Sequence, residues 1–487
     1  MLFNSYVFIL LFLPITVGGY YYLNHQKQYH VGMLWLFLMS CWFVGYLDIR
    51  YLVMLLVSIG MNYGILFFMR KSSDKKIRKR WLAAGVTGNI FLLLYFKYMN
   101  FFLENINQLT GSEYSMLQLF LPLGISFYVF QQITCLVDSY KNAELQFNFM
   151  EYAVYVSFFP QFIQGPIVLM EEMLPQLRDK SKKKWNDEDF AKGLYAFALG
   201  LSKKVLIADV LAGVVNIGYK EMWQINRISA VFVILAYTLQ IYFDFSGYCD
   251  MALGIGKMFR LELPINFHSP YKGVSIADFW DRWHITLTRF FTRYVYIPLG
   301  GSRKGTVRTY VNIFVIFLLS GFWHGAAWTF VLWGVMHGIA MVLKRVMKTV
   351  KWNLPKWLEW AFTFVFVNIA WVFFRADTIQ QGKKLLQAAW SGKTGGLQTF
   401  LYERFGERME VSLFIRMDIF DLFSNLTVTL FVVFIIGSMI ACFTMKNTQE
   451  KLAEFKPTIR KMWVTIFLLF WSVISLSGIS EFIYFNF

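Results

Sequence analysis

The sequence is poor in charged residues. Asp, Glu, Lys and Arg account for 16% of its 487 residues, while hydrophobic residues account for 57% and aromatic residues for 20%. Soluble globular proteins carry about 25% charged residues, and so few charges could not cover a water-facing surface around so much apolar side chain. The shortage of charge therefore argues against a soluble protein and favours one that resides in a membrane.

Cysteines and familiar catalytic motifs are also scarce. The sequence contains neither G-x-S-x-G nor H-E-x-x-H, which removes the motif support for a serine hydrolase or a zinc protease. We expect no metal and no tightly bound cofactor. The four cysteines all lie in apolar segments without metal-ligand spacing, and we interpret them as small buried hydrophobes: Cys41, Cys135, Cys249 and Cys442.

Long apolar runs fill most of the chain, and several reach the roughly 20 residues that a bilayer-spanning helix needs. No basic residue precedes the first run, so we expect it to remain as a span and not to be cleaved as a signal peptide. We predict an all-α polytopic membrane protein with helices near residues 2–23, 31–47, 49–69, 82–103, 115–138, 190–219, 229–252, 309–326, 328–343, 357–374, 420–445 and 462–482.

Two stretches do not fit simple crossings. Residues 149–170 are interrupted by Pro160 and by Gly165-Pro166, and broken backbone at membrane depth is tolerated only where protein or a water-filled cavity shields it. We therefore predict a re-entrant or interfacial segment there, and a second irregular stretch over 253–308. The chain shows no internal repeat of the kind that secondary transporters carry. We expect one integral-membrane domain over 1–487, with a motif-bearing core near 1–380 and two further spans within 381–487.

The net charge of +17 could suggest nucleic acid, but the placement of the charges argues against it. Basic residues gather in short clusters between spans, near 70–80, 178–184, 344–351 and 451–461, whereas 104–114 holds no Lys or Arg. Lys and Arg collect in cytoplasmic loops, so we predict the basic clusters inside, 104–114 outside and the N-terminus outside. A basic inner face would contact anionic membrane lipids and attract an anionic co-substrate.

The stretch 277–305 carries three arginines on one helical face. At about 100° per residue, Arg282, Arg289 and Arg293 fall within about 40° of one another. Trp280, His284, Leu287 and Phe291 fall on the opposite face. We predict an amphipathic helix in the cytoplasmic interface, with the arginines binding lipid head groups or the phosphates of a cofactor.

Histidines occur at the ends of apolar runs. His324 lies between Gly321 and Gly325 in "SGFWHGAAWTF", where the glycines allow backbone or substrate to approach closely. An ionisable group in a membrane is costly and marks function more often than packing. His337 would point away from His324 on one continuous helix, which argues against a two-histidine metal site. That argument weakens if the chain reverses after Trp328.

Acidic residues also occur at membrane depth. Asp244 and Asp250, in "LQIYFDFSGYCDMALGIG", are expected to pair with Lys97 or Arg375, or to line a polar channel. The nearby Gly254-x-Gly256-Lys257 matches neither a phosphate-binding loop nor a dinucleotide fingerprint, and we assign it to the end of a helix.

Seven motifs follow one another along the chain: "LPLGISFYVFQ" (121–131), "FFPQFIQGPI" (158–167), "QIYFDFSGYCDMALG" (240–254), "NFHSPY" (266–271), "FWDRWHITLTRFFTRYVYIPLGG" (279–301), "SGFWHGAAWTFVLWG" (320–334) and "WVFFRA" (371–376). In this order they resemble the membrane-bound O-acyltransferases, and within them the alginate O-acetyltransferase branch. The similarity covers roughly residues 1–380. His268 departs from the pattern, and we attach no role to it.

The resemblance implies a ring of about 11–13 tilted transmembrane helices, with re-entrant helices, around a central funnel in a bacterial plasma membrane. It implies that His324 is catalytic and that His284 is the second histidine of the family. It also implies a cytoplasmic acyl donor such as acetyl-CoA, an extracytoplasmic SGNH-type acetyltransferase partner and a cell-envelope polysaccharide as the final acceptor. Two alternatives remain at this point: D-alanyl transfer from a carrier protein toward teichoic acid, and a transporter that needs no catalytic histidine.

Overall fold

The computed structural model describes residues 1–352, 354–407, 426–476 and 482–483. Within these residues the regular elements are helices, and a single bridge joins Phe267 to Trp283. The first part contains η1 (Val7–Phe12), α1 (Leu13–His25), α2 (Tyr29–Gly45), α3 (Ile49–Lys71), α4 (Lys75–Leu93), η2 (Leu94–Tyr98), α5 (Met99–Thr110), α6 (Ile125–Lys141), α7 (Phe149–Ser157), α8 (Phe159–Phe162), α9 (Met170–Arg178) and η3 (Lys180–Lys183).

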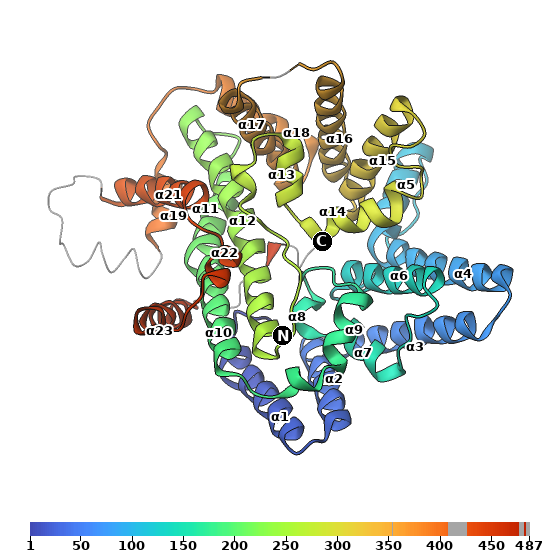
Figure 1. The fold of residues 1–487 in the computed structure, drawn as a ribbon. Helices are drawn as coiled ribbons and strands as arrows, with labels where there is room; N and C mark the ends of the chain where they lie inside the picture. The colour runs from blue at the N-terminus through green and yellow to red at the C-terminus, as the bar shows by residue number, and fades with distance from the viewer. Residues whose placement is uncertain (353, 408–425, 477–481, 484–487) are drawn as a thin grey trace.

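The second part is built around one long helix, α12 (Arg227–Met258), against which α10 packs most extensively. Figure 1 shows these two helices side by side through the middle of the molecule. The remaining elements are α10 (Asp187–Ser202), η4 (Lys203–Ala208), α11 (Asp209–Lys220), η5 (Pro270–Lys272), α13 (Ile276–Arg282), α14 (Ile285–Phe291), η6 (Thr292–Tyr296), α15 (Thr306–His324), α16 (Trp328–Thr349), α17 (Lys356–Arg375), α18 (Ile379–Ser391), α19 (Thr399–Gly406), α21 (Leu426–Thr444), α22 (Thr448–Ala453) and α23 (Ile459–Ile474).

The helices confirm an all-α polytopic membrane protein. Eight helical stretches in the described parts of the chain are long and apolar enough to cross a bilayer, and α2 is a shorter apolar helix. Each predicted span coincides with a helix, although α6 begins at Ile125, later than the predicted 115, and α23 ends at Ile474. Residues 420–425 and 477–481, which belong to two of the predicted spans, lie outside the described residues.

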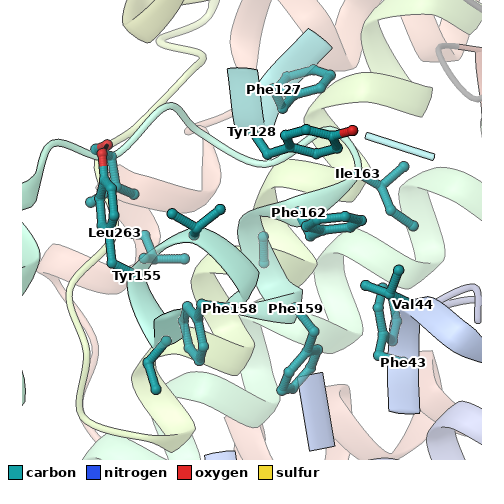
Figure 2. Close-up of a cluster of buried hydrophobic side chains, with 14 of the residues drawn as sticks. Phe43, Val44, Phe127, Tyr128, Tyr155, Phe158, Phe159, Phe162, Ile163 and Leu263 are labelled. Atoms are coloured by element: carbon teal, nitrogen blue, oxygen red, sulfur yellow. Dashed lines mark hydrogen bonds between the residues drawn. The ribbon is translucent and has the colours of Figure 1, made fainter. Parts of the chain in front are cut away.

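The segment 149–170 is interrupted as the prolines predicted. Helix α7 ends at Ser157, the four-residue α8 follows, and residues 163–169 run without regular structure. The segment is buried throughout, apart from its first residues, and Figure 2 shows Phe158, Phe159 and Phe162 pointing into a cluster of apolar side chains. Protein therefore shields the broken backbone of this segment.

The predicted single helix over the three arginines is wrong in one respect. The stretch forms three short elements, α13, α14 and η6, and not one helix. The break falls at His284, whose φ of 46° and ψ of 52° place it in the left-handed region. The predicted division of the side chains into a buried and a more exposed face is nevertheless confirmed. Trp280, His284 and Leu287 are buried, while the three arginines are only half-buried.

Residues near the beginning of the chain and Phe482 pack against the same helix, α12. Phe3 and Phe482 are fully buried, and both rings contact the ring of Tyr248 on α12, with centroid separations of 4.8 and 5.1 Å. The backbone N–H of Ile483 donates to Asp244. The described part of the 381–487 extension is thus packed against the motif-bearing core.

Candidate active site

His324 lies at the turn between two antiparallel helices. Helix α15 ends at His324, and α16 begins four residues later, so the chain does reverse before Trp328. The two helices approach closely at Gly321 and Gly334, where an added Cβ would lie 2.4 and 2.5 Å from carbonyl oxygens of the opposite helix. Gly325, the residue after His324, is equally close to the ring of Phe330, and an added Cβ there would clash with it. These glycines serve helix packing and leave no open space beside the histidine.

Aromatic side chains surround the imidazole of His324, which is 2% exposed. Its ring centroid lies 4.9 Å from that of Trp323, 5.1 Å from that of Trp333 and 5.2 Å from that of Phe374. Such an apolar enclosure disfavours the charged form of an imidazole and favours the neutral ring that acts as a base.

Two side chains from η2 hold the last turn of α15. The ammonium of Lys97 donates to the carbonyl oxygens of Trp323 and His324 at 2.6 and 3.2 Å, and to the hydroxyl of Ser126 at 3.3 Å. The hydroxyl of Tyr98 donates to Phe322 O at 2.5 Å. The last carbonyls of a helix have no intrahelical donor, and they carry partial negative charge. Lys97 and Tyr98 satisfy them and so fix the backbone of His324.

His284 is held through its ring. It is 1% exposed, its Nδ1 lies 3.3 Å from Asn266 Oδ1, and its ring centroid lies 4.8 Å from that of Phe245. His284 lies outside the candidate spans, and burial lowers the pKa of its imidazole well below the ordinary value. The ring is therefore neutral at physiological pH.

The structure brings the two predicted catalytic histidines to one place. The Trp323 ring contacts both imidazoles, with centroid separations of 6.1 Å to His284 and 4.9 Å to His324. His284 lies between α13 and α14, and His324 ends α15, 40 positions later in the sequence. Two buried imidazoles are therefore in contact with one indole ring in the interior of the protein.

His337 takes a different position from the one that a continuous helix predicts. Because the chain reverses, His337 contacts the same Trp333 ring as His324, at a centroid separation of 4.7 Å. The indole N–H of Trp280 donates to His337 Nδ1 at 3.2 Å. In the described parts of the chain, no group of three or more His, Cys, Asp and Glu residues could hold a metal ion.

The three arginines form ion pairs with other parts of the protein. Arg289 binds Glu172 and the carbonyl of Ile167, while Arg293 binds Glu171 at 2.6 Å and Asp138 at 3.1 Å. These contacts tie η6 and α14 to α9 and α6. Arg282 pairs with Asp278 of its own helix at 2.6 Å and contacts His268. Their predicted role toward cofactor phosphates stays a prediction.

The expected partners of the buried acids were wrong. Asp244 pairs with Lys204 at 2.7 Å, and Asp250 pairs with Lys203 at 2.5 Å. Lys97 instead binds the end of α15, and Arg375 contacts Asp377 and Asn216. Sequence spacing cannot show that η4 packs along α12, which brings the two lysines beside the two acids. Asp250 also lines a small polar cavity together with Lys203, Ser246, Cys249, Asn266 and Thr448.

Sequence reasoning missed the two residues that hold the histidines. Lys97 interrupts an apolar run, and this signal marked it as a candidate ion-pair partner, not as a cap for α15. Asn266 opens the motif "NFHSPY", and only its place in that motif could have singled it out. The contact of Lys97 joins segments 226 residues apart, whereas Asn266 and His284 are 18 residues apart and are brought together by the break between α13 and α14.

Three kinds of known protein are similar in sequence to this chain. A "Peptidoglycan O-acetyltransferase" of Helicobacter pylori is 43% identical over 417 residues, which cover 80% of this chain and 79% of that protein. A "Probable alginate O-acetylase AlgI" of Pseudomonas aeruginosa is 35% identical over 398 residues, or 80% of this chain and 75% of that protein. A "Teichoic acid D-alanyltransferase" of Bacillus subtilis is 25% identical over 251 residues, or 48% of this chain and 62% of that protein.

The sequence profile of MBOAT, the membrane-bound O-acyltransferase family, matches residues 82–378. This range begins in α4, ends just beyond α17, and includes both histidines that contact Trp323. The chain therefore belongs to the membrane-bound O-acyltransferase family.

Proposed function

We propose that this multi-pass membrane acyltransferase takes an acetyl group from cytoplasmic acetyl-CoA and passes it across a bacterial plasma membrane, for O-acetylation of a cell-envelope polysaccharide. The observation that carries the proposal is the pair of buried histidines at Trp323, inside a chain similar to proteins named for O-acetylation of peptidoglycan and alginate. Neither similarity decides which polysaccharide is modified.

The chemistry needs little from the protein beyond a base and shielding from water. A thioester is already activated, so attack by an acceptor hydroxyl on its carbonyl requires removal of the hydroxyl proton and stabilisation of the oxyanion. The new C–O ester bond forms as the C–S bond breaks, and the CoA sulfur leaves and takes up the proton from the base. We assign proton removal to His324, whose neutral imidazole is enclosed by aromatic rings. His284 lies across Trp323 and contributes the second imidazole.

Acetyl transfer is favoured over D-alanyl transfer by the extent of the similarity. The peptidoglycan O-acetyltransferase aligns with 80% of this chain at 43% identity, whereas the D-alanyltransferase aligns with 48% at 25% identity. Under this proposal an extracytoplasmic SGNH-type acetyltransferase receives the acetyl group. The basic clusters predicted to face the cytoplasm suit the phosphates of the donor.

The test is to delete the coding sequence from its host and measure ester-linked acetate on the purified envelope polysaccharides. We expect one polysaccharide to lose its acetate, and to regain it with the wild-type chain but not with His324→Ala. A fall in ester-linked D-alanine in place of acetate would support the D-alanyl alternative. Full rescue by His324→Ala at equal protein level would contradict the assignment of His324.

A further inference from the structure

The side-chain oxygen of Asn266 is surrounded by donors. It lies 2.6 Å from Thr286 Oγ1, 3.2 Å from Thr286 N and 3.3 Å from His284 Nδ1, and the side chain is almost completely buried. The backbone N–H of Thr286 can only donate, so this atom of Asn266 is the carbonyl oxygen and not the amide nitrogen. The amide nitrogen, on the other side, donates to Cys249 Sγ at 3.5 Å. The orientation of the amide is therefore determined by its neighbours.

This orientation decides the tautomer of His284. A carbonyl oxygen accepts hydrogen bonds, so the Nδ1 that faces it carries the proton. In the neutral ring the lone pair then resides on Nε2. Among the residues that the structure describes, Nε2 is buried and has no hydrogen-bond partner. An unpartnered acceptor in a buried ring is costly, and it marks the position where a substrate group can supply the missing hydrogen bond.

His337 has the opposite arrangement, which makes it a useful internal comparison. Its Nδ1 accepts the indole N–H of Trp280 at 3.2 Å, so its neutral ring carries the proton on Nε2. The surroundings of each histidine thus select a different tautomer, and only His284 of these two leaves a lone pair at Nε2.

The backbone around His284 is organised to hold this contact. The strand-like segment at Asn266 pairs with the α13–α14 corner, since Ile285 N donates to Asn266 O at 3.1 Å and His268 N donates to Arg282 O at 3.0 Å. His284 itself occupies the left-handed region, which a non-glycine residue keeps only where its surroundings impose it. Thr286 Oγ1 also accepts from Ile167 N at 3.0 Å, which joins the corner to the interrupted segment 149–170.

We propose that Asn266 is the positioning residue that holds His284 as the Nδ1–H tautomer, so that Nε2 is kept as a hydrogen-bond acceptor toward the reacting group. The participation of His284 in acyl transfer rests on the proposed function. The tautomer does not, and it can be measured without a donor or an acceptor.

The decisive variant is Asn266→Asp, with Asn368→Asp as its matched control. A carboxylate at 266 still accepts from Nδ1, but its charge favours the imidazolium, which has no lone pair at Nε2. Asn368 is another buried amide whose oxygen accepts a hydroxyl, that of Thr238 at 2.6 Å, and it has no histidine partner. We expect Asn266→Asp to lower kcat at pH 7 by roughly tenfold or more, with a much smaller change in KM. Activity should recover as the pH rises above the raised pKa of His284.

A single pH profile shared by Asn266→Asp, Asn368→Asp and the wild type would overturn the proposal. A second measurement tests the tautomer in the wild-type protein in detergent, so it does not depend on whether the Asn266→Asp variant folds. The ¹⁵N spectrum of histidine-labelled protein is compared with that of His284→Gln, and the missing signals belong to His284. We expect an Nδ1–H, Nε2-lone-pair pattern for His284. An Nε2–H pattern would contradict the proposal, even if acetyl transfer itself is confirmed.

Discussion

The two histidines at Trp323 are held in opposite ways. His324 is fixed through its backbone, because Lys97 and Tyr98 bind the last carbonyls of α15 and leave its ring among aromatic side chains. His284 is fixed through its ring by Asn266, and its backbone is in a strained conformation. The position of His324 thus depends on the end of a helix, while the protonation pattern of His284 depends on one amide.

The largest effect is expected for His324→Ala. Loss of a general base commonly costs about 10²–10⁴-fold in rate, and we expect acetyl transfer to fall by that amount while the protein still inserts. Because the ring is tightly packed, removal also leaves a cavity, so initial rates are compared at equal amounts of monodisperse protein in detergent. Transfer within about threefold of the wild type would return His324 to a packing role.

Lys97→Met tests the backbone contact to His324. Methionine keeps most of the side-chain length but removes the ammonium donor to the carbonyls of Trp323 and His324, of which Trp323 O keeps the Tyr98 hydroxyl at 3.3 Å. An unsatisfied buried group costs about 1–3 kcal/mol. We expect kcat to fall roughly ten- to a hundredfold through misplacement of the imidazole, with partial rescue in Lys97→Arg. Equal loss in both variants, with unchanged thermal stability, would argue for a role of the ammonium in the chemistry itself.

The arginines near His284 are expected to affect donor binding. Arg293 holds the pKa of Glu171 below its ordinary value, so this ion pair is charged at neutral pH. Ion pairs that are a third to a half exposed contribute at most about 1 kcal/mol. In Arg289→Gln combined with Arg293→Gln, we expect the KM for acetyl-CoA to rise about three- to tenfold with little change in kcat.

The matched control for the arginines is Glu171→Gln combined with Glu172→Gln, which breaks their ion pairs with α9, leaves the pair of Arg293 with Asp138 and keeps both guanidinium groups. If the arginines contact donor phosphates, this control leaves the KM unchanged or lowers it. An equal rise in KM in both double variants would show that the arginines only connect α14 and η6 to α9.

The smallest effect is expected for His337→Ala. His337 shares Trp333 with His324, but its Nδ1 is occupied by the indole N–H of Trp280. We expect activity within about threefold of the wild type and a lower thermal unfolding temperature, since a buried ring is lost. Trp280→Phe, which removes only the donor to His337, should behave similarly. A loss as large as that in His324→Ala would extend the site to His337.

Apolar run length is a local signal, and it was sufficient to predict most of the helices. The ordered motifs singled out His284 and His324, which the structure brings to one indole ring, while their catalytic role stays a prediction. It predicted the interruption at Pro160 for the same reason. It failed at Asp244, Asp250 and Lys97, whose partners come from segments that only helix packing brings together. The left-handed conformation of His284 was also missed, because the sequence has no glycine or proline at the break between α13 and α14.

The central claim is that an acetyl group crosses the membrane by a route that depends on His324. The most direct measurement uses sealed inside-out vesicles that contain the full chain and its polysaccharide acceptor system, with labelled acetyl-CoA supplied only on the outer, cytoplasm-derived side. We expect labelled acetate to appear on polysaccharide inside the vesicles with the wild type, and to be absent with His324→Ala at equal protein level. Equal labelling with both proteins, or labelling only when acetyl-CoA is sealed inside the vesicles, would contradict the account.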